Sequence, residues 1–240
     1  LNDIIGPNVF EVSDNQISKF GFGRTNHLIF NQYEAQIDTG RMIRSLYDLA
    51  LQKGIRIING VEIQHIESNS KQIKLNSSLG LIIADRCLVA TNGLTRELLP
   101  NLDVKPARAQ VLITEPIDRL KLKGTFHYEQ GYYYFRNVGN RILFGGGRNL
   151  AIQDEETTEI GLSKLIQEKL DDLLRTVIIP DRSYQVDHRW AGIMGVSNSK
   201  SAITEAISDN LFVAVRLGGM GVALGSQVGR NAIDTFFGIQ

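Results

Sequence analysis

The stretch that says most about the fold is LFVAVRLGGMGVALG, residues 211–225. This stretch joins an apolar strand, Leu211–Val215, to a helix that we predict to continue to Phe237. The glycines between strand and helix open the backbone to a ligand, because no Cβ lies in the way. The first helical turn adds unpaired N–H groups and the positive end of the helix dipole. The stretch predicts either a ligand-binding turn or a tight turn that needs small residues for packing.

A second apolar strand lies upstream. The run Cys87–Ala90 is typical of a strand that is buried on both faces of a parallel sheet, and Thr91-Asn92-Gly93 closes it. Before it, Asp38 or Thr39 caps a helix that ends at Gly54. We predict short strands at 55–58, 61–66, 72–75 and 79–83, with a turn at 68–70.

The middle of the chain has a different pattern. We predict antiparallel strands at 111–114, 132–136 and 141–144, with a hairpin turn at 137–140. One amphipathic helix is predicted over 156–176, and a strand over 184–193. The apolar stripe of that helix consists of Ile160, Leu165, Ile166, Leu170, Leu173 and Leu174. Residues 1–35 are expected to be irregular.

These patterns predict an α/β (α+β) fold with two discontinuous domains. Residues 36–104 and 191–240 form a partial, Rossmann-like nucleotide-binding domain. Residues 1–35 and 105–190 form an inserted domain with a mostly antiparallel sheet. A ligand would bind where the glycine turns end the apolar strands.

The composition excludes several classes of protein. Lysine plus arginine and aspartate plus glutamate number 26 each, so the chain has no net charge that favours nucleic acid. No apolar run approaches the roughly 20 residues that span a bilayer. The single cysteine, Cys87, rules out an intramolecular disulfide and favours a buried core thiol, and we expect a cytoplasmic protein. No spacing predicts a metal site or a hydrolase triad. The oligomeric state is left open.

Six segments share their order and spacing with one known family. They are 46–61, 84–93, 106–116, 132–147, 190–193 and 218–225. Together they resemble the FAD-dependent oxidoreductases of the D-amino-acid oxidase, glycine oxidase and sarcosine oxidase superfamily. The resemblance implies an enzyme in which FAD takes a hydride from the carbon that bears an amine. Its substrate would be a small amine or amino acid.

The resemblance also implies site residues. It implies that FAD is bound by Val61, Ala90, Thr91, Asn92, Gly93, Gly192, Ile193, Gly218, Gly219, Met220, Gly221 and Val222. It implies catalytic roles for Tyr133 and Arg148, with Arg136 and Arg108 as alternatives for binding a substrate carboxylate. Tyr133 and Tyr134 point to opposite faces of a strand, so only one of them can reach a pocket. The alternative interpretation is that these tyrosines and arginines are ordinary sheet and surface residues.

The sequence departs from the family at several places. No Gly-x-Gly-x-x-Gly occurs in it, and it begins with Leu1, so we expect a truncated chain that binds FAD poorly and is inactive alone. Met194 stands where related oxidases carry an arginine for the substrate carboxylate, and Arg216 stands where they carry a small residue. No cysteine lies near the last glycine turn, so a covalently bound flavin is not expected. A non-catalytic remnant or interaction domain is the alternative function, and an FAD site completed by a partner chain is a third.

Overall fold

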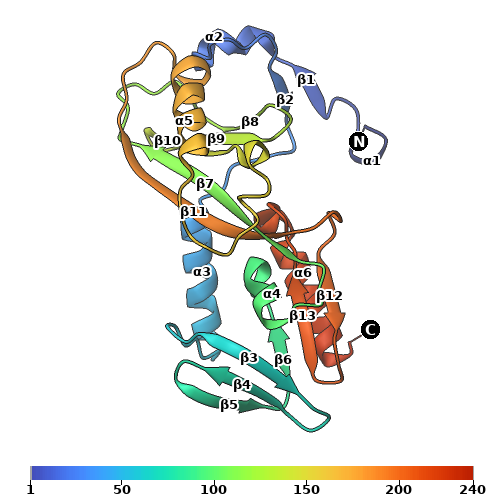
Figure 1. Ribbon diagram of the computed structural model, residues 1–240. Coiled ribbons are helices and arrows are strands. Elements are labelled where there is room, and N and C mark those ends of the chain that lie inside the picture. Colours follow the sequence, from blue (N-terminus) through green and yellow to red (C-terminus); the bar gives the residue numbers. More distant parts are fainter. Residues whose placement is uncertain (1, 240) are drawn as a thin grey trace. The chain divides into compact units, whose positions relative to one another are not determined.

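The computed structural model describes residues 2–239 and contains two compact units (Figure 1). Unit 1 comprises Leu1–Ile37, Ala109–Glu155 and Ile160–Gly192. Unit 2 comprises Asp38–Arg108, Glu156–Glu159 and Ile193–Gln240. Residues 105–108 and 156–159 thus belong to unit 2, whereas the predicted boundaries put them in the inserted domain. That unit 2 is the FAD-binding domain and unit 1 the substrate domain stays a prediction.

Unit 1 is built around a five-stranded sheet in the order β11-β7-β10-β9-β8. The strands are β7 (Lys105–Thr114), β8 (Thr125–Tyr128), β9 (Tyr133–Val138), β10 (Arg141–Gly146) and β11 (Val186–Val196). The pairs β7–β10, β10–β9 and β9–β8 are antiparallel. Helix α5 (Lys164–Leu173) packs on one face, as Figure 1 shows, and continues into a π-helical turn, Leu174–Ile178. Between helix and sheet lies a core that includes Leu112, Phe135, Phe144, Ile166 and Leu170.

The first 35 residues contain more regular structure than the sequence predicted. They form α1 (Asn2–Ile5), β1 (Phe10–Val12), the 3-10 turn η1 (Asp14–Gln16), α2 (Ile17–Phe20) and β2 (Ile29–Asn31). The strands β1 and β2 pair antiparallel. The Asp14 carboxylate holds the loop between them, because it accepts hydrogen bonds from the Leu28 amide at 2.8 Å and the His27 ring at 3.0 Å. The Leu28 amide and His27 lower the pKa of Asp14.

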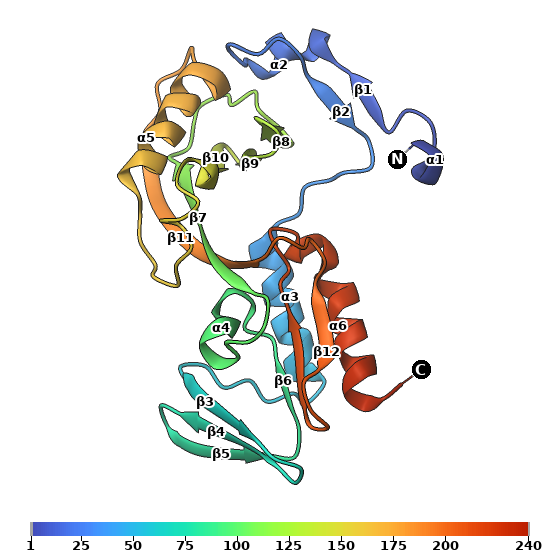
Figure 2. The ribbon, with the colours of Figure 1, turned by 45° about the vertical axis from the view of Figure 1, so that its right-hand side comes forward.

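Unit 2 combines two three-stranded sheets with helices (Figure 2). One sheet has the order β3-β4-β5 and the other the order β12-β13-β6. The strands are β3 (Ile63–Ser68), β4 (Ile73–Ser77), β5 (Gly80–Ala84), β6 (Cys87–Val89), β12 (Ile203–Ala206) and β13 (Leu211–Val215). The helices are α3 (Thr39–Gln52), α4 (Thr95–Leu98) and α6 (Gly221–Phe237), and a 3-10 turn, η2 (Asn92–Leu94), precedes α4. Buried Ile73, Val89, Val213 and Val215 belong to its core.

The helix predicted over 156–176 is wrong at its start. Long-range contacts hold the chain before Lys164 in a non-helical path: Lys105 Nζ pairs with Glu156 at 3.0 Å, and the Ser163 amide donates to Gln110 at 2.9 Å. Ser163 then caps α5. Two of the predicted stripe residues are exposed: Ile160, which lies before α5, and Leu165, which lies within it.

The other corrections concern strands. Residues 55–58 form no strand, because Gly54 ends α3 with a positive φ and the described residues offer no strand partner. The short strands β8 and β12 were missed. The apolar run predicted a strand buried on both faces of a parallel sheet: β6 does pair in parallel, with β13, but it pairs with no other described strand and is only partly buried.

The Cys87 thiol is expected to react slowly with a disulfide reagent such as Ellman's reagent. It is half-buried in β6, and this burial raises its pKa, so the reactive thiolate is scarcer than in a free thiol. The rate in the native chain at about pH 8 should be several-fold below that in the guanidinium-unfolded chain. Equal rates would show that the thiol is open to solvent.

Candidate functional site

The carboxyl ends of β6 and β13 meet at one edge of the sheet in unit 2. The two strands are parallel, with Leu211 opposite Cys87 and Val213 opposite Val89. The turns that follow them are therefore neighbours. A hydrogen bond joins these turns, since the Leu217 amide donates to Asn92 Oδ1 at 3.1 Å.

The end of β11 closes against both turns. A Cβ on Gly93 would lie 2.6 Å from the Met194 carbonyl oxygen, and one on Gly195 would lie 2.7 Å from Asn92 Oδ1. A side chain at position 93 would force a backbone shift, and one at position 195 would displace the Asn92 side chain that holds Leu217. The Gly218 amide donates to the Gly195 carbonyl at 2.9 Å. Two segments distant in sequence, at Asn92 and at Gly195, thus hold residues 217–221, which we call the glycine turn.

The glycine turn presents unpaired amides. Helix α6 begins at Gly221 without a side-chain cap. Among the hydrogen bonds of the described residues, none uses the amides of Gly219, Gly221 or Val222 as donors. Met220 and Val222 beside them are 57% and 51% exposed. With the positive end of the α6 dipole, these amides can bind an acceptor atom or a negative charge.

Most of the predicted cofactor residues lie in or beside the glycine turn. The turn and the start of α6 contain Gly218, Gly219, Met220, Gly221 and Val222. The segments that contact the turn contain Asn92, Gly93 and Ile193. Ala90 and Thr91 follow β6, and Thr91 Oγ1 lies 3.0 Å from Thr95 Oγ1. No contact among the described residues joins Val61 to the turn, and Gly192 belongs to unit 1. That any of these residues binds FAD stays a prediction.

The predicted tyrosine is buried. Tyr133 is 0% exposed in the core under α5, and its hydroxyl has no hydrogen-bond partner among the described residues. Burial and nearby Glu129 raise its pKa. Tyr134 points to the opposite face of the sheet, where it is 36% exposed. A Cβ on Gly145 would lie 2.8 Å from the Tyr134 hydroxyl, so this glycine makes room for the ring.

The predicted arginine, Arg148, follows β10 in a 3-10 turn, Arg148–Leu150, and is partly buried. No ion pair of the described residues includes it. The two arginines named as alternatives already donate hydrogen bonds to backbone carbonyls: Arg136 to that of Ile37, and Arg108 to that of Glu159 at 3.3 Å. Trp190 is 39% exposed and stacks on His188, with ring centroids 5.6 Å apart.

Sequence reasoning missed Gly195 and the contacts of Arg216. Gly195 is signalled only by its place at the end of a predicted strand, and nothing local shows that Asn92 packs on it. Arg216 was noted only as a departure from a family pattern. Its partners, Asp103 and Ser201, are 113 and 15 residues away along the chain.

Comparison with known proteins decides the family. The model of the family described as DAO, FAD dependent oxidoreductase, matches residues 13–235. The chain belongs to this family. Among its relatives is the tRNA 5-methylaminomethyl-2-thiouridine biosynthesis bifunctional protein MnmC of Idiomarina loihiensis, which is 28% identical over 187 residues. That match covers 75% of this chain and 29% of MnmC.

Solved structures share the fold of this DAO-family chain. Glycine oxidase from Geobacillus kaustophilus superposes with a TM-score of 0.80 at 15% identity, over 96% of this chain and 64% of that one. Iminodiacetate oxidase from Chelativorans sp. BNC1 gives 0.79 at 15% identity, over 98% and 65%. The L-proline dehydrogenase of P. horikoshii gives 0.77 at 13%, over 95% and 64%. The chain therefore spans just under two thirds of each of these proteins.

The residues present fit one part of FAD, the flavin ring. Acceptor atoms on the edge of that ring suit the amides of Gly219, Gly221 and Val222, which lack acceptors within the described part of the chain. Gly219 adds no Cβ to the surface, and beyond its chain neighbours the described residues place only Met194 Sδ, at 3.8 Å, near the position that a Cβ would take. No described helix is long and apolar enough to cross a membrane. Residues 2–239 contain no cluster of three or more potential metal ligands.

Proposed function

We propose that this chain is part of a cytoplasmic FAD-dependent enzyme that oxidises the C–N bond of an amine or amino acid. The observation that carries the proposal is the set of unpaired amides at Gly219, Gly221 and Val222, in a chain of the DAO family. When bound, FAD would supply the acceptor for a hydride from the carbon that bears the amine. The start of α6 would then stabilise negative charge on the flavin edge.

The substrate would be held by the sheet face of unit 1 that points away from α5. Tyr134, Leu143 and Val111 lie on this face, opposite the side that packs in the core. Tyr134 supports the proposal better than Tyr133, whose side chain is enclosed. Arg148 remains our proposed partner for a substrate carboxylate, because it is partly buried and has no ion pair within residues 2–239.

Unit 2 supports the proposal that further polypeptide completes the FAD site. Helix α3 is amphipathic, yet none of its residues is buried, and its apolar Ile43 and Leu46 are 60% and 54% exposed. In β5, Leu81 and Ile83 are 57% and 58% exposed. Large exposed apolar areas mark surfaces that pack against something else. We accordingly propose that the 240 residues alone bind FAD poorly and do not turn over substrate.

The likeness to MnmC favours a second candidate substrate. MnmC is a protein of tRNA 5-methylaminomethyl-2-thiouridine biosynthesis, and it is 28% identical to this chain, against 12–15% for the solved structures. The nucleoside in its name carries an amine on a carbon side chain, so its chemistry is compatible with C–N oxidation. An aminomethyl group on a modified nucleoside is therefore the alternative to a free amino acid.

The test is to purify the natural protein and record its intact mass and visible spectrum. We expect a flavin spectrum, FAD on release, and reduction of the flavin under anaerobic conditions by one of the amines offered. Glycine, proline, iminodiacetate and an aminomethyl-2-thiouridine nucleoside are the substrates to compare. A natural protein of 26.7 kDa that stays colourless with added FAD would contradict the proposal and favour a non-catalytic remnant.

A further inference from the structure

Arg216 has an unusual backbone conformation at the entrance to the glycine turn. Its φ is +64°, in the left-handed region that glycine adopts freely and other residues adopt at a cost. The preceding residue, Val215, is fully buried at the end of β13. The next residue, Leu217, is held by Asn92. Arg216 therefore sets the direction in which the chain leaves the sheet.

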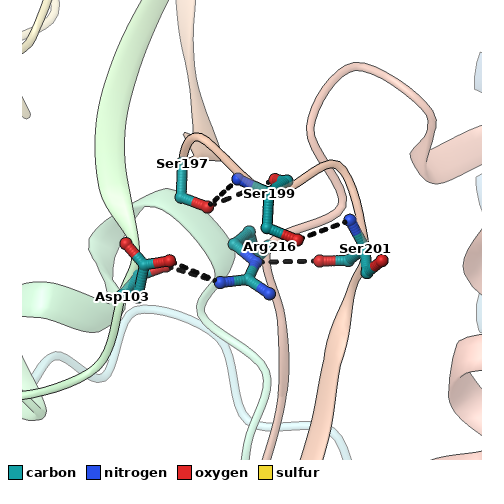
Figure 3. Close-up of polar contacts among 5 residues, drawn as sticks. All are labelled: Asp103, Ser197, Ser199, Ser201 and Arg216. Atoms are coloured by element: carbon teal, nitrogen blue, oxygen red, sulfur yellow. Dashed lines mark hydrogen bonds and ion pairs between the residues drawn. The ribbon is translucent and has the colours of Figure 1, made fainter.

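The guanidinium of Arg216 bonds two other segments of unit 2 (Figure 3). Nε donates to the Ser201 carbonyl at 2.8 Å. Nη1 donates to the Asp103 carbonyl at 3.1 Å and to its carboxylate at 2.9 Å. The Arg216 side chain is only 11% exposed, although the Asp103 side chain is 67% exposed. These are charge-assisted bonds of a planar group in a partly shielded place, which are stronger than neutral ones.

One of the two acceptor residues, Ser201, lies in a loop with hydrogen bonds of its own. The Ser199 amide donates to Ser197 Oγ at 3.0 Å, and the Ser201 amide donates to Ser199 Oγ at 3.3 Å. Figure 3 shows this serine loop on one side of the guanidinium and Asp103 on the other. Arg216 is thus bonded to both sides by a planar fork that a lysine could not reproduce, because an ammonium carries all three of its N–H donors on one nitrogen.

We propose that Arg216 is a positioning residue for the flavin end of the site. Its guanidinium holds the left-handed backbone at 216 and thereby directs the amides of Gly219, Gly221 and Val222. A glycine at this position would adopt the same φ without strain, so the stabilising contribution of arginine must come from its side-chain bonds. The part of the inference that concerns flavin rests on the function proposed above.

The first test follows hydrogen exchange in the chain without FAD. Arg216→Gly removes the bonds and the strain together, and we expect exchange at the hydrogen-bonded amides of Leu217, Gly218 and Met220 to be about tenfold faster. Arg216→Lys should lie between the wild type and Arg216→Gly, and Asp103→Asn should show a smaller increase. The matched control is Arg230→Ala, which removes an exposed arginine of α6 and should change nothing in this segment. Unchanged or slower exchange in Arg216→Gly would overturn the inference.

The second test measures FAD affinity and the flavin absorption spectrum in the natural protein carrying the same substitutions. We expect Arg216→Gly to weaken FAD binding about tenfold and shift the spectrum while its melting temperature stays near the wild-type value, with partial recovery in Arg216→Lys. If wild type fails to bind FAD, the proposed function fails, and exchange alone still decides the role of Arg216. If wild type binds FAD and Arg216→Gly binds it equally, Arg216 is not a positioning residue.

Discussion

Replacing Gly146 with alanine is expected to destabilise unit 1 by about 2–6 kcal/mol, enough to unfold it at ordinary temperature. The φ of Gly146 is +126°, a conformation that side-chain-bearing residues rarely adopt. A Cβ there would lie 2.1 Å from the Tyr132 carbonyl oxygen and 2.7 Å from the Tyr133 Cα. Both neighbours are backbone atoms of the facing segment of the same hairpin, so no side-chain rotation can relieve the overlap.

The measurement is urea unfolding of Gly146→Ala beside Gly139→Ala. Gly139 lies in the turn of the same hairpin with a φ of +58°, and a Cβ there would meet nothing within 4 Å. Its substitution should cost only the left-handed strain, about 1 kcal/mol. Equal losses in the free energy of unfolding would show that the close approach at Gly146 is absent.

Replacing Gly219 with valine is expected to leave the fold intact and to weaken FAD binding by about tenfold or more, which is a loss of about 1.4 kcal/mol per factor of ten. Apart from its two chain neighbours, the described residues place only Met194 Sδ, at 3.8 Å, within 4 Å of a Cβ at this position, so the first carbon of the new side chain meets no clash. The valine would instead occupy the space in front of the unpaired amides of Gly221 and Val222. Weaker FAD binding with an intact fold is the result expected if the glycine turn binds a ligand. A turn whose glycines serve only packing would not give this result.

Fluorescence titration of the natural protein with FAD measures this effect, with thermal unfolding in parallel. The control is Gly229→Val, on the same helix at a position where a Cβ meets nothing within 4 Å. It should bind FAD like the wild type. If Gly219→Val folds and binds FAD normally, the glycine turn is not where the flavin ring lies. If it unfolds, this glycine is required for packing within the turn.

Local sequence patterns predicted the structure correctly where interactions between near neighbours in the chain determine it. Apolar runs with glycine ends predicted β6, β13 and α6, and alternation predicted the hairpin of β9 and β10. The start of α5 could not be predicted in this way. A helical periodicity extends over residues 156–163, but the bonds of Lys105 and Gln110 to that segment are absent from any local window.

For the candidate site, the sequence by itself determined the glycine turn, the strand that leads into it and the helix that leaves it, because strand and turn preferences act between near neighbours. It also determined the family through the order of six short segments. Only the tertiary structure decided which tyrosine of the pair is enclosed, that Gly93 and Gly195 are sites of close approach, and that Arg216 bonds Asp103 and Ser201. These features depend on segments far apart in the chain, which come into contact only when the sheets have formed and the core has closed.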